Sequence, residues 1–508
     1  MKIQQPHSIL LIGIVLLFLV VLMGGCKSTK LVGEDEYLLD KLTIECDKSE
    51  LESKKLLTTM KQKPNRKMLG VYRFHLATYN LFHPKDTSKH PPKLITRIGN
   101  VVGEPPVIYE KALHDKSRKN LVNYLHKKGY YNAVVVDTMI VHRRNKKKAN
   151  LSFKITAGEP YTINRISYDI IDPFIKDIVF ADTVKSKIKS GDVFDLDKLL
   201  EERERVSHLI RNSGYYYFSS ENIHYYADTI LSGNVVNLTM TIKKSFEADR
   251  YFLQEIFTRQ TIKNVYVYCN FNRGRFAVEK EAYLKTLDTV YYENLTLLVD
   301  GKLTIKPKVI LQANYIETGE DYNVDNVVQT QKHLSSLKQF KGVNIQFSES
   351  PEYVKNAWDA ENPWLDAHIF LSNTLRQGYS ITAEGTNSSG NYGVAGVITY
   401  QNQNLFRGAE MFSTKLTGSF QTLAGDDEIG EKQLLNTFEF GPEIRLDFPK
   451  LMLPLQSERF IKRHNPSTNI GLSFNHQDRH DYTRTLGNAS FGYTWHSENG
   501  YFKHSVNP

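Results

Sequence analysis

Hydrophobic residues in the first three quarters of the chain follow an order that recurs. In its clearest copy, a Gly-acid turn at residues 190–194 precedes a segment whose apolar residues have helical spacing. Gly214 comes directly after this segment, where a glycine can adopt the left-handed conformation that ends a helix. The segments 161–170, 215–218 and 235–242 are rich in aromatic and β-branched residues and predict strands. The apolar positions of the predicted helix are Leu196, Leu199, Leu200, Val206, Leu209 and Ile210.

The same order occurs before and after this copy. In the first copy, Gly103-Glu104 precedes a predicted helix, and Gly129-Tyr130-Tyr131 follows it. The apolar positions of this helix are Leu113, Leu121, Val122 and Leu125. Strands are predicted at 37–46, 133–141 and 149–156. In the third copy, the turn at 318–322 precedes Val327, Leu334, Leu337 and Phe340, and the strands are predicted at 308–315 and 342–347. Three tandem domains of mixed α and β structure are therefore expected.

From about residue 375 the helical spacing disappears and apolar and polar residues alternate. Segments of about nine to twelve residues, divided by Gly, Asn and Asp turns, are typical of strands that face lipid on one side. The predicted strands are residues 378–386, 393–403, 409–422, 435–448, 469–476 and 482–496. The turn at 387–391 is short, whereas the connection at 423–433 is longer and acidic. This part is expected to be an antiparallel transmembrane β-barrel.

The N-terminus has the pattern of a secretory signal. Lys2 precedes an apolar run at residues 9–23, which is shorter than the roughly 20 residues of a membrane-spanning helix. The segment Leu22-Met23-Gly24-Gly25-Cys26 resembles the lipobox of bacterial lipoproteins, with Met23 where leucine is usual. The resemblance implies that Cys26 carries acyl chains, palmitate among them, and becomes the first residue of the mature protein.

Composition and motifs limit the classes of function that are expected for this chain. The chain has 508 residues, with 65 basic and 56 acidic side chains that give a formal charge of +9, and the charge is spread out rather than gathered on a base-reading element. No nucleic-acid binding is expected. The sequence has no Gly-x-Ser-x-Gly, His-Glu-x-x-His or paired Cys-x-x-Cys motif, so no enzyme activity, cofactor or metal is expected. Cys46 and Cys269 are expected to be single apolar fillers without a disulfide.

A β-α-α-β-β order with Gly-Tyr-Tyr after the second helix resembles the POTRA domain, and the whole chain resembles the BamA/TamA family. The insertion at residues 63–106 resembles the N-terminal region of the lipoprotein TamL. The expected divisions are 1–25 signal peptide, 26–36 lipidated linker, 37–158, 159–245 and 246–373 POTRA-like domains, and 374–508 barrel. Six strands cannot close a barrel in lipid, and the family resemblance implies about sixteen, so the chain is expected to end within the barrel at Pro508.

The resemblance also implies two site segments. The first barrel strand would offer its edge to a client strand, and its residues are Gly378, Tyr379, Ser380, Ile381, Thr382, Ala383, Glu384, Gly385 and Thr386. A periplasmic turn between the second and third barrel strands resembles the Asn-Leu-Phe-x-x-Gly-Glu segment of the family, with glycine and alanine exchanged in order; its residues are Asn404, Leu405, Phe406, Arg407 and Gly408. A plain β-turn is the alternative interpretation of this segment.

These features imply a factor that assembles or translocates outer-membrane proteins. It would be lipid-anchored in the cell outer membrane, with its POTRA domains in the periplasm. Its partners would be outer-membrane lipid, unfolded outer-membrane protein clients and a TamB-like periplasmic protein. The alternatives are a dedicated pore of the two-partner secretion type and a barrel fused to a patatin-like lipase.

Overall fold

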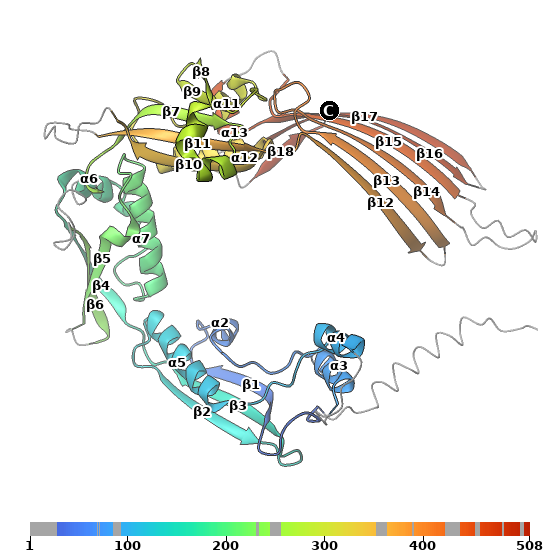
Figure 1. Cartoon of the computed structure of the whole chain (residues 1–508). Coiled ribbons are helices and arrows are strands. Elements are labelled where there is room, and N and C mark those ends of the chain that lie inside the picture. The colour runs from blue at the N-terminus through green and yellow to red at the C-terminus, as the bar shows by residue number, and fades with distance from the viewer. Residues whose placement is uncertain are drawn as a thin grey trace, which may run out of the picture. The chain divides into compact units, whose positions relative to one another are not determined.

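The computed structural model describes residues 28–507 apart from 69, 71, 85–92, 230–232, 244–255, 352–362, 389–390, 422–436, 453–457, 480–481 and 498–501 (Figure 1). The signal peptide, Cys26 and the acidic connection at 423–433 lie outside these residues. The chain forms two compact units, and the helices and strands are described below in chain order. The first comprises residues 1–171, 182–204 and 223–242, and the second comprises residues 172–181, 205–222 and 243–508.

The first α+β domain has the expected strand–helix–helix–strand–strand order with two further helices inserted. Its elements are β1 (Leu38–Cys46), α2 (Ser53–Thr58), α3 (Phe74–Phe82), α4 (Lys93–Val102), α5 (Lys111–Lys127), β2 (Val134–Val141) and β3 (Lys148–Thr156). The sheet order is β1-β3-β2, with β1 parallel and β2 antiparallel to β3. Leu121 and Leu125 of α5 pack on Phe153 and Ile155 of β3, so one face of the sheet holds the core. Helices α3 and α4 occupy the predicted insertion.

The second domain repeats this topology. Its elements are β4 (Thr162–Ile170), α6 (Pro173–Ala181), α7 (Leu196–Arg211), β5 (Ile223–Asp228) and β6 (Val235–Ile242). The sheet order is β4-β6-β5, with β4 parallel to β6. The predicted strand at 215–218 is wrong, because these residues form a turn after α7. Tyr215 and Phe218 are buried there, and their burial accounts for the aromatic run without any strand pairing.

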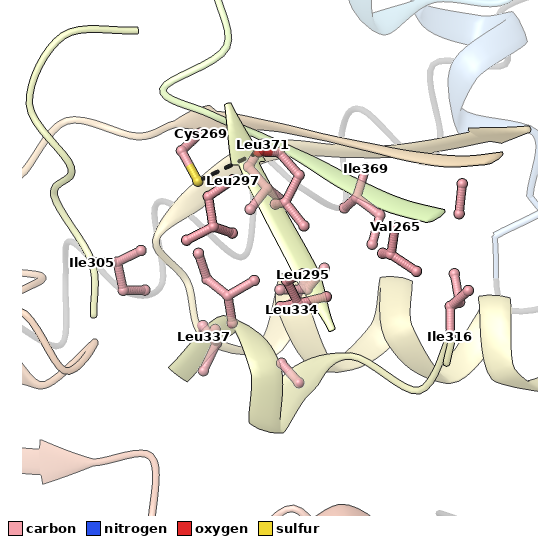
Figure 2. Packing of buried hydrophobic residues seen from close by; sticks show 14 of the residues in the cluster. Val265, Cys269, Leu295, Leu297, Ile305, Ile316, Leu334, Leu337, Ile369 and Leu371 are labelled. Carbon is pink, nitrogen blue, oxygen red and sulfur yellow. Dashed lines mark hydrogen bonds between the residues drawn. The ribbon is translucent and has the colours of Figure 1, made fainter. Parts of the chain in front are cut away.

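The third domain contains a larger sheet. Its elements are β7 (Thr261–Cys269), α9 (Arg273–Val278), α10 (Lys280–Lys285), β8 (Asp288–Tyr292), β9 (Leu295–Val299), α11 (Pro307–Ala313), α12 (Val324–Ser336), β10 (Phe340–Glu349) and β11 (Trp364–Asn373). The sheet order is β10-β11-β7-β9-β8. Figure 2 shows the core, in which Val265, Cys269 and Ile369 of the strands face Leu334 of α12.

The predicted strand at 308–315 is wrong, since this segment belongs to helix α11. Pro307 is the first residue of the helix, a position where the missing N–H of proline costs nothing. Ile310 and Ala313 are buried on one side, and α11 is the first helix of the pair that precedes β10 and β11. The strand that begins this domain is β7, and α9, α10, β8 and β9 are inserted after it.

The repeated Gly-Tyr-Tyr segment joins one domain to the next. Gly129 and Gly214 both have positive φ, 87° and 106°, and their carbonyls accept hydrogen bonds of 2.9 Å from the next domain, from Tyr161 N and Gln260 N. The first tyrosine of each pair, Tyr130 or Tyr215, is buried, and the second packs against the next domain. Tyr131 contacts Tyr161, and Tyr216 contacts Tyr322 and Phe347.

The last part of the chain is a seven-stranded antiparallel sheet in sequential order. Its strands are β12 (Gln377–Ser388), β13 (Asn391–Asn402), β14 (Met411–Gln421), β15 (Thr437–Phe448), β16 (Ser467–Arg479), β17 (Thr483–His496) and β18 (Lys503–Val506), and α13 (Glu458–His464) connects β15 to β16. Each of the six strands expected from the alternating pattern is present, and β18 is additional. Among the described residues, none of the helices combines the length and apolar composition needed to cross a membrane.

The register of this sheet separates apolar from polar side chains. Directly paired residues point to the same side, so one row crosses the sheet through Ser380, Thr399, Lys415, Glu443, Ser473 and Asn488. The neighbouring row on the opposite face is Tyr379, Tyr400, Thr414, Ile444, Leu472 and Ala489. Large apolar side chains on that second face, among them Ile381, Leu416 and Phe474, are exposed.

One site interrupts the pairing between β15 and β16. The register runs from Phe438 to Phe440 and resumes at Glu443, and Gly441 and Pro442 have no paired residue in β16. Proline has no N–H to donate to a neighbouring strand, which accounts for the gap. On its other side Pro442 still pairs with Leu416 of β14.

Candidate functional site

Strand β12, which contains the predicted edge segment Gly378–Thr386, lies at one end of the seven-stranded sheet. It pairs with β13 over twelve residues, from Gln377↔Asn402 to Ser388↔Asn391, and has no other strand neighbour among the described residues. One row of its main-chain N–H and C=O groups is therefore open to a further strand. The structure places the predicted segment at an edge; whether a client uses that edge stays a prediction.

The side chains of β12 leave this edge accessible. Tyr379 and Ile381 on the apolar face are 75% and 80% exposed, and Tyr379 contacts only its cross-strand neighbour Tyr400, with ring centroids 5.0 Å apart, among the described aromatic residues. Gly378 and Gly385 have open space where a side chain would be. An added strand would meet little steric resistance along β12.

The predicted turn Asn404–Gly408 connects β13 to β14 and is held by side chains at both ends. The Asn404 side chain accepts a hydrogen bond from Ala409 N at 3.1 Å. The Glu410 carboxylate accepts from Phe406 N at 3.1 Å and from Gly408 N at 2.9 Å. Asn404, Ala409 and Glu410 are all buried. These polar contacts fix the turn, and its likeness to the family segment stays a prediction.

Glycine at 408 and alanine at 409, exchanged in order relative to the family segment, are explained by different contacts. Glycine at 408 avoids a close contact, because a Cβ there would lie 2.2 Å from Glu410 Oε1 and the Glu410 carboxylate would have to move. Ala409 has φ +63°, a conformation that would suit glycine better, and its methyl group joins the core of the third domain. Arg407 also has positive φ, at 65°. The turn therefore stores backbone strain of about 1–2 kcal/mol per residue that its contacts must offset.

This turn docks on the third domain through the segment before α11. Asn404 Nδ2 donates to Thr304 O at 2.8 Å, Lys306 N donates to Arg407 O at 2.8 Å, and the Arg407 guanidinium donates to Leu303 O at 2.8 Å. Arg376, just before β12, donates to Asn404 O at 3.0 Å. The first strands of the sheet are thus fixed to the preceding domain at the start of the candidate edge.

Helix α13 makes a second attachment to the same domain. Tyr315 donates to Lys462 O, the Lys462 ammonium lies 2.8 Å from Glu317, and Asn465 Nδ2 donates to Ser336 Oγ at 3.1 Å. Among the described residues, the connections β13–β14 and β15–β16 therefore both contact the third domain. Sequence reasoning missed α13 and its partners; the only available sign was the basic Lys462-Arg463-His464 end of a short helix.

A buried histidine lies at this second attachment. Burial, together with the nearby charges of Lys332 and His496, lowers the pKa of His333 to about 4. Its Nδ1 lies 3.0 Å from the Tyr315 hydroxyl. Because that hydroxyl donates to Lys462 O, a neutral His333 would donate its Nδ1 proton to Tyr315. Burial also raises the pKa of Tyr315, which keeps its hydroxyl protonated.

The second domain has an edge of its own beside an apolar groove. Strand β5 is the last strand of its sheet and pairs only with β6 among the described residues. The groove has a volume of about 430 Å³ and lies between the first turns of α7 and β5. Leu196, Leu199, Leu200, Tyr225 and Tyr226 line it, and Arg203 is the charged residue at its side.

The cysteines and the possible metal ligands are the remaining candidate residues. Cys46 and Cys269 are free thiols, and burial raises the pKa of Cys269 to about 12. Within the described part of the chain, no group of three or more His, Cys, Asp and Glu side chains is arranged to hold a metal ion. Lipidation of Cys26 stays a prediction, since that residue lies outside the described part.

No family model and no curated protein sequence matches the chain. Solved structures do match it at low identity. Domains POTRA3–5 of Haemophilus influenzae BamA match with a TM-score of 0.31 and 12% identity, over 68% of this chain and 100% of that chain. Haemophilus ducreyi BamA lacking POTRA1–3 matches with a TM-score of 0.32 and 11% identity, over 68% of this chain and 63% of that chain.

CdiB from Acinetobacter baumannii matches with a TM-score of 0.26 and 10% identity, over 69% of this chain and 63% of that chain. The chain thus covers less than two thirds of the length of this protein and of the H. ducreyi protein. At these TM-scores the likeness carries no function over to this chain. Its function rests on the geometry described above.

Proposed function

We propose that this chain is an outer-membrane assembly factor whose sheet is the first part of a membrane β-barrel and whose edge strand β12 accepts client strands. The observation that carries the proposal is the combination, in one sheet, of an exposed apolar face and an open edge fixed to a preceding domain. The α+β domains before it are POTRA-like in their strand order.

The exposed apolar face of the sheet favours contact with lipid. Exposed Ile381, Leu416, Ile444 and Leu472 extend across strands β12 to β16, and a soluble protein rarely exposes so wide an apolar surface. The polar face carries charged groups such as Lys415, Glu439 and Glu443, which fits a water-filled interior. Closure of the sheet would satisfy its edges in hydrocarbon, where an unpaired backbone group costs several kcal/mol.

The open edges explain how clients would be handled. An unfolded outer-membrane protein supplies extended segments with alternating apolar residues, which fit the β5 edge and its groove through main-chain bonds. Transfer to β12 would then place a client strand at the membrane sheet. A TamB-like periplasmic protein is a second partner for the POTRA-like domains, and an acylated Cys26 would hold the first domain at the outer membrane, with all three domains in the periplasm.

Photo-cross-linking tests the role of β12. A photoreactive residue at Thr382, in the edge strand, is expected to capture outer-membrane protein clients in cells. Thr417 provides the matched control, because it is also a threonine on the polar face, but its strand β14 pairs on both sides. Equal capture at both positions, or capture at neither while depletion lowers the levels of many outer-membrane proteins, would contradict the proposal.

A dedicated secretion pore of the two-partner type is a second candidate, favoured by the charged polar face that would line a channel. The two functions differ in the number of proteins affected. Depletion of an assembly factor lowers many outer-membrane proteins, whereas depletion of a dedicated exporter removes one secreted protein and leaves the census of the membrane unchanged.

A further inference from the structure

Helices α3 and α4 form a hairpin, residues 74–82 and 93–102, that exposes apolar side chains. Phe74 and Leu81 are seven residues apart in α3 and so share one face of that helix, roughly opposite the buried Leu76. Leu81 is 64% exposed and Phe74 is 37% exposed. In α4, Val101 is 76% exposed and lies one turn after exposed Arg97. Apolar groups and a cation thus share the outer side of α4.

The two helices already satisfy each other, so these exposed residues are not needed for packing within the hairpin. A Cβ at Gly99 would lie 2.9 Å from Phe82 Cβ, and a Cβ at Gly103 would lie 2.8 Å from Tyr79 Cα, which shows how closely the helices approach. His75 Nδ1 donates to Val102 O at 2.7 Å, and Glu104 N donates to His75 O at 3.0 Å. The exposed side chains of the hairpin are therefore available to contact a partner.

The segment that follows Cys26 is fixed to this hairpin. Lys30 Nζ donates to the carbonyls of Asn80 and His83 at 2.5 and 2.9 Å and so caps the end of α3. Asn80 Nδ2 donates to Ser28 O at 3.3 Å. Val32 packs with Leu38 and Leu76 in a small core. Ser28 is two residues from Cys26, and two residues span at most about 7 Å.

The sequence that contains the hairpin is basic. From Lys63 to Gly103 the sequence has eight Lys and Arg residues and one acidic residue, Asp86. Two of these eight residues form ion pairs with acidic residues outside this range. Arg73 pairs with Asp40, and Arg66 lies 3.9 Å from Glu104. The basic run at residues 143–148 meets the segment that follows Cys26, because Lys147 Nζ donates to Val32 O at 3.0 Å.

We propose that the α3–α4 hairpin is a membrane-surface element that inserts Leu81 and Val101 among anionic lipid headgroups. The inference rests on the lipid anchor of the proposed function for its placement. Apolar side chains with flanking cations on a short helix are what an anionic bilayer surface binds, since the apolar groups enter the acyl boundary and the cations meet phosphate. The anchor and the hairpin would together hold the first domain at a fixed orientation to the bilayer, which one flexible tether could not do.

Spin-label depth measurements on the full chain test this proposal. The protein is purified from outer membranes and reconstituted in phosphatidylcholine vesicles with or without phosphatidylglycerol, with a nitroxide at Leu81→Cys or Val101→Cys. A third label at Val136→Cys is the matched control, because Val136 is an exposed valine of β2 in the same unit. Cys46 is replaced by serine, Cys269 is buried, and the intact mass shows whether Cys26 carries acyl chains or a spin label.

With phosphatidylglycerol, the labels at 81 and 101 are expected to become severalfold more accessible to oxygen and severalfold less accessible to a water-soluble nickel chelate. The label at 136 is expected to stay accessible to the chelate. Labels at 81 and 101 that remain accessible to the chelate in these vesicles would overturn the proposal, as would a label at 136 that is shielded to the same degree.

Intact mass of the same samples separates this proposal from the anchor. If Cys26 carries acyl chains and positions 81 and 101 stay in water, the hairpin proposal fails and the anchor stands. If Cys26 carries none and both positions still enter the bilayer, the anchor fails and the hairpin proposal stands. Shielding of both positions in whole envelopes but not in vesicles would indicate a protein partner and overturn the proposal.

Discussion

The buried Glu410 carboxylate decides the shape of the 404–410 turn. It accepts hydrogen bonds from Phe406 N and Gly408 N, and it leaves no room for a side chain on residue 408. A carboxylate that accepts two main-chain donors cannot move without leaving both unsatisfied, which costs about 1–3 kcal/mol for each buried group.

Replacement of Gly408 by alanine is therefore expected to destabilise the docked turn by about 1–3 kcal/mol. The expected readout is faster hydrogen exchange of the amides in residues 404–410. Gly418→Ala in β14 is the control, because a Cβ there meets no atom within 4 Å. The same exchange rates in both variants would show that the Glu410 contact does not limit residue 408.

His333 predicts a pH dependence at the attachment of α13. Its pKa is lowered from 6.5 to about 4, so the unfolded chain binds the proton more readily than the folded one. The stability associated with neutral His333 is present above pH 6.5 and is lost as the pH falls toward 4, by at most about 3 kcal/mol. Hydrogen exchange in α12, corrected for its intrinsic pH dependence, should accelerate over this range.

The His333→Asn variant keeps a donor near Tyr315 and should remove most of this pH dependence. His224→Asn, at an exposed position on β5, should leave it unchanged. An unaltered pH profile in the His333 variant would assign the effect to other groups.

At the residue level, the sequence predicted a family-like turn at residues 404–408, whose role stays a prediction, but it did not predict the contacts that hold this turn. The spacing of Asn404, Phe406 and Gly408 suggested a family-like turn. The Glu410 contact is local, but the hydrogen bonds to Leu303, Thr304 and Lys306 join residues about 100 positions apart. No local pattern encodes such pairing. The positive φ of Ala409 was equally hidden, because alanine does not signal a left-handed conformation as glycine does.

Among the elements, the joints between domains depend on a glycine that ends a helix. Gly129 combines positive φ with a close approach, since a Cβ there would lie 2.8 Å from Phe194 O in the next domain. Lys128 strengthens the same joint with contacts of 2.8 Å to Asp195 and Asp197. Burial alone would lower the pKa of Lys128, but these two carboxylates raise it above its ordinary value.

Gly129→Ala is expected to loosen this joint by about 1–3 kcal/mol, beyond the strain of alanine at positive φ. Gly158→Ala is a matched control, because Gly158 also has positive φ, at 70°, but its Cβ would meet nothing within 4 Å. Limited proteolysis at residues 157–161 should be faster in the first variant than in the second. Equal cleavage would mean that the approach of Phe194 does not hold the joint.

Element prediction succeeded where one spacing was clear and failed where two interpretations competed. The alternation in strands β12 to β17 has a single solution, and all six were found close to their expected bounds. The continuous apolar run Val309-Ile310-Leu311 fits a buried strand or a helix equally well, and Pro307 was the overlooked sign of a helix start. The aromatic residues at 215–218 pack in a turn. The prediction that they form a strand was wrong.

On the scale of the whole molecule, two independent features are expected to hold the protein in the membrane: the apolar sheet face and the acylated Cys26. A Cys26→Ala variant with a conventional signal peptide should stay in the membrane fraction after alkaline carbonate extraction, because the sheet face alone retains it. Release of this variant into the soluble fraction would contradict the barrel and leave only the anchor.

The order of many helices and strands was predictable from the sequence because each copy carries its own helix and strand signals. The mixed α+β class and the antiparallel sheet at the end of the described chain are confirmed, whereas the predicted domain boundaries stay predictions. The inserted hairpin of β8 and β9 was not anticipated, since it interrupts the third copy without a repeat of its own. Strand counts beyond β18 and the identity of clients stay predictions.

The missing pairs at Gly441 and Pro442 have a mechanical consequence. Elsewhere in the sheet each strand is bound to its neighbour by a continuous ladder, which resists shear. At this point β15 and β16 lack pairing for two residues, and glycine adds torsional freedom. Bending of the sheet is expected to concentrate at this position, while β12, three strands away, keeps its register.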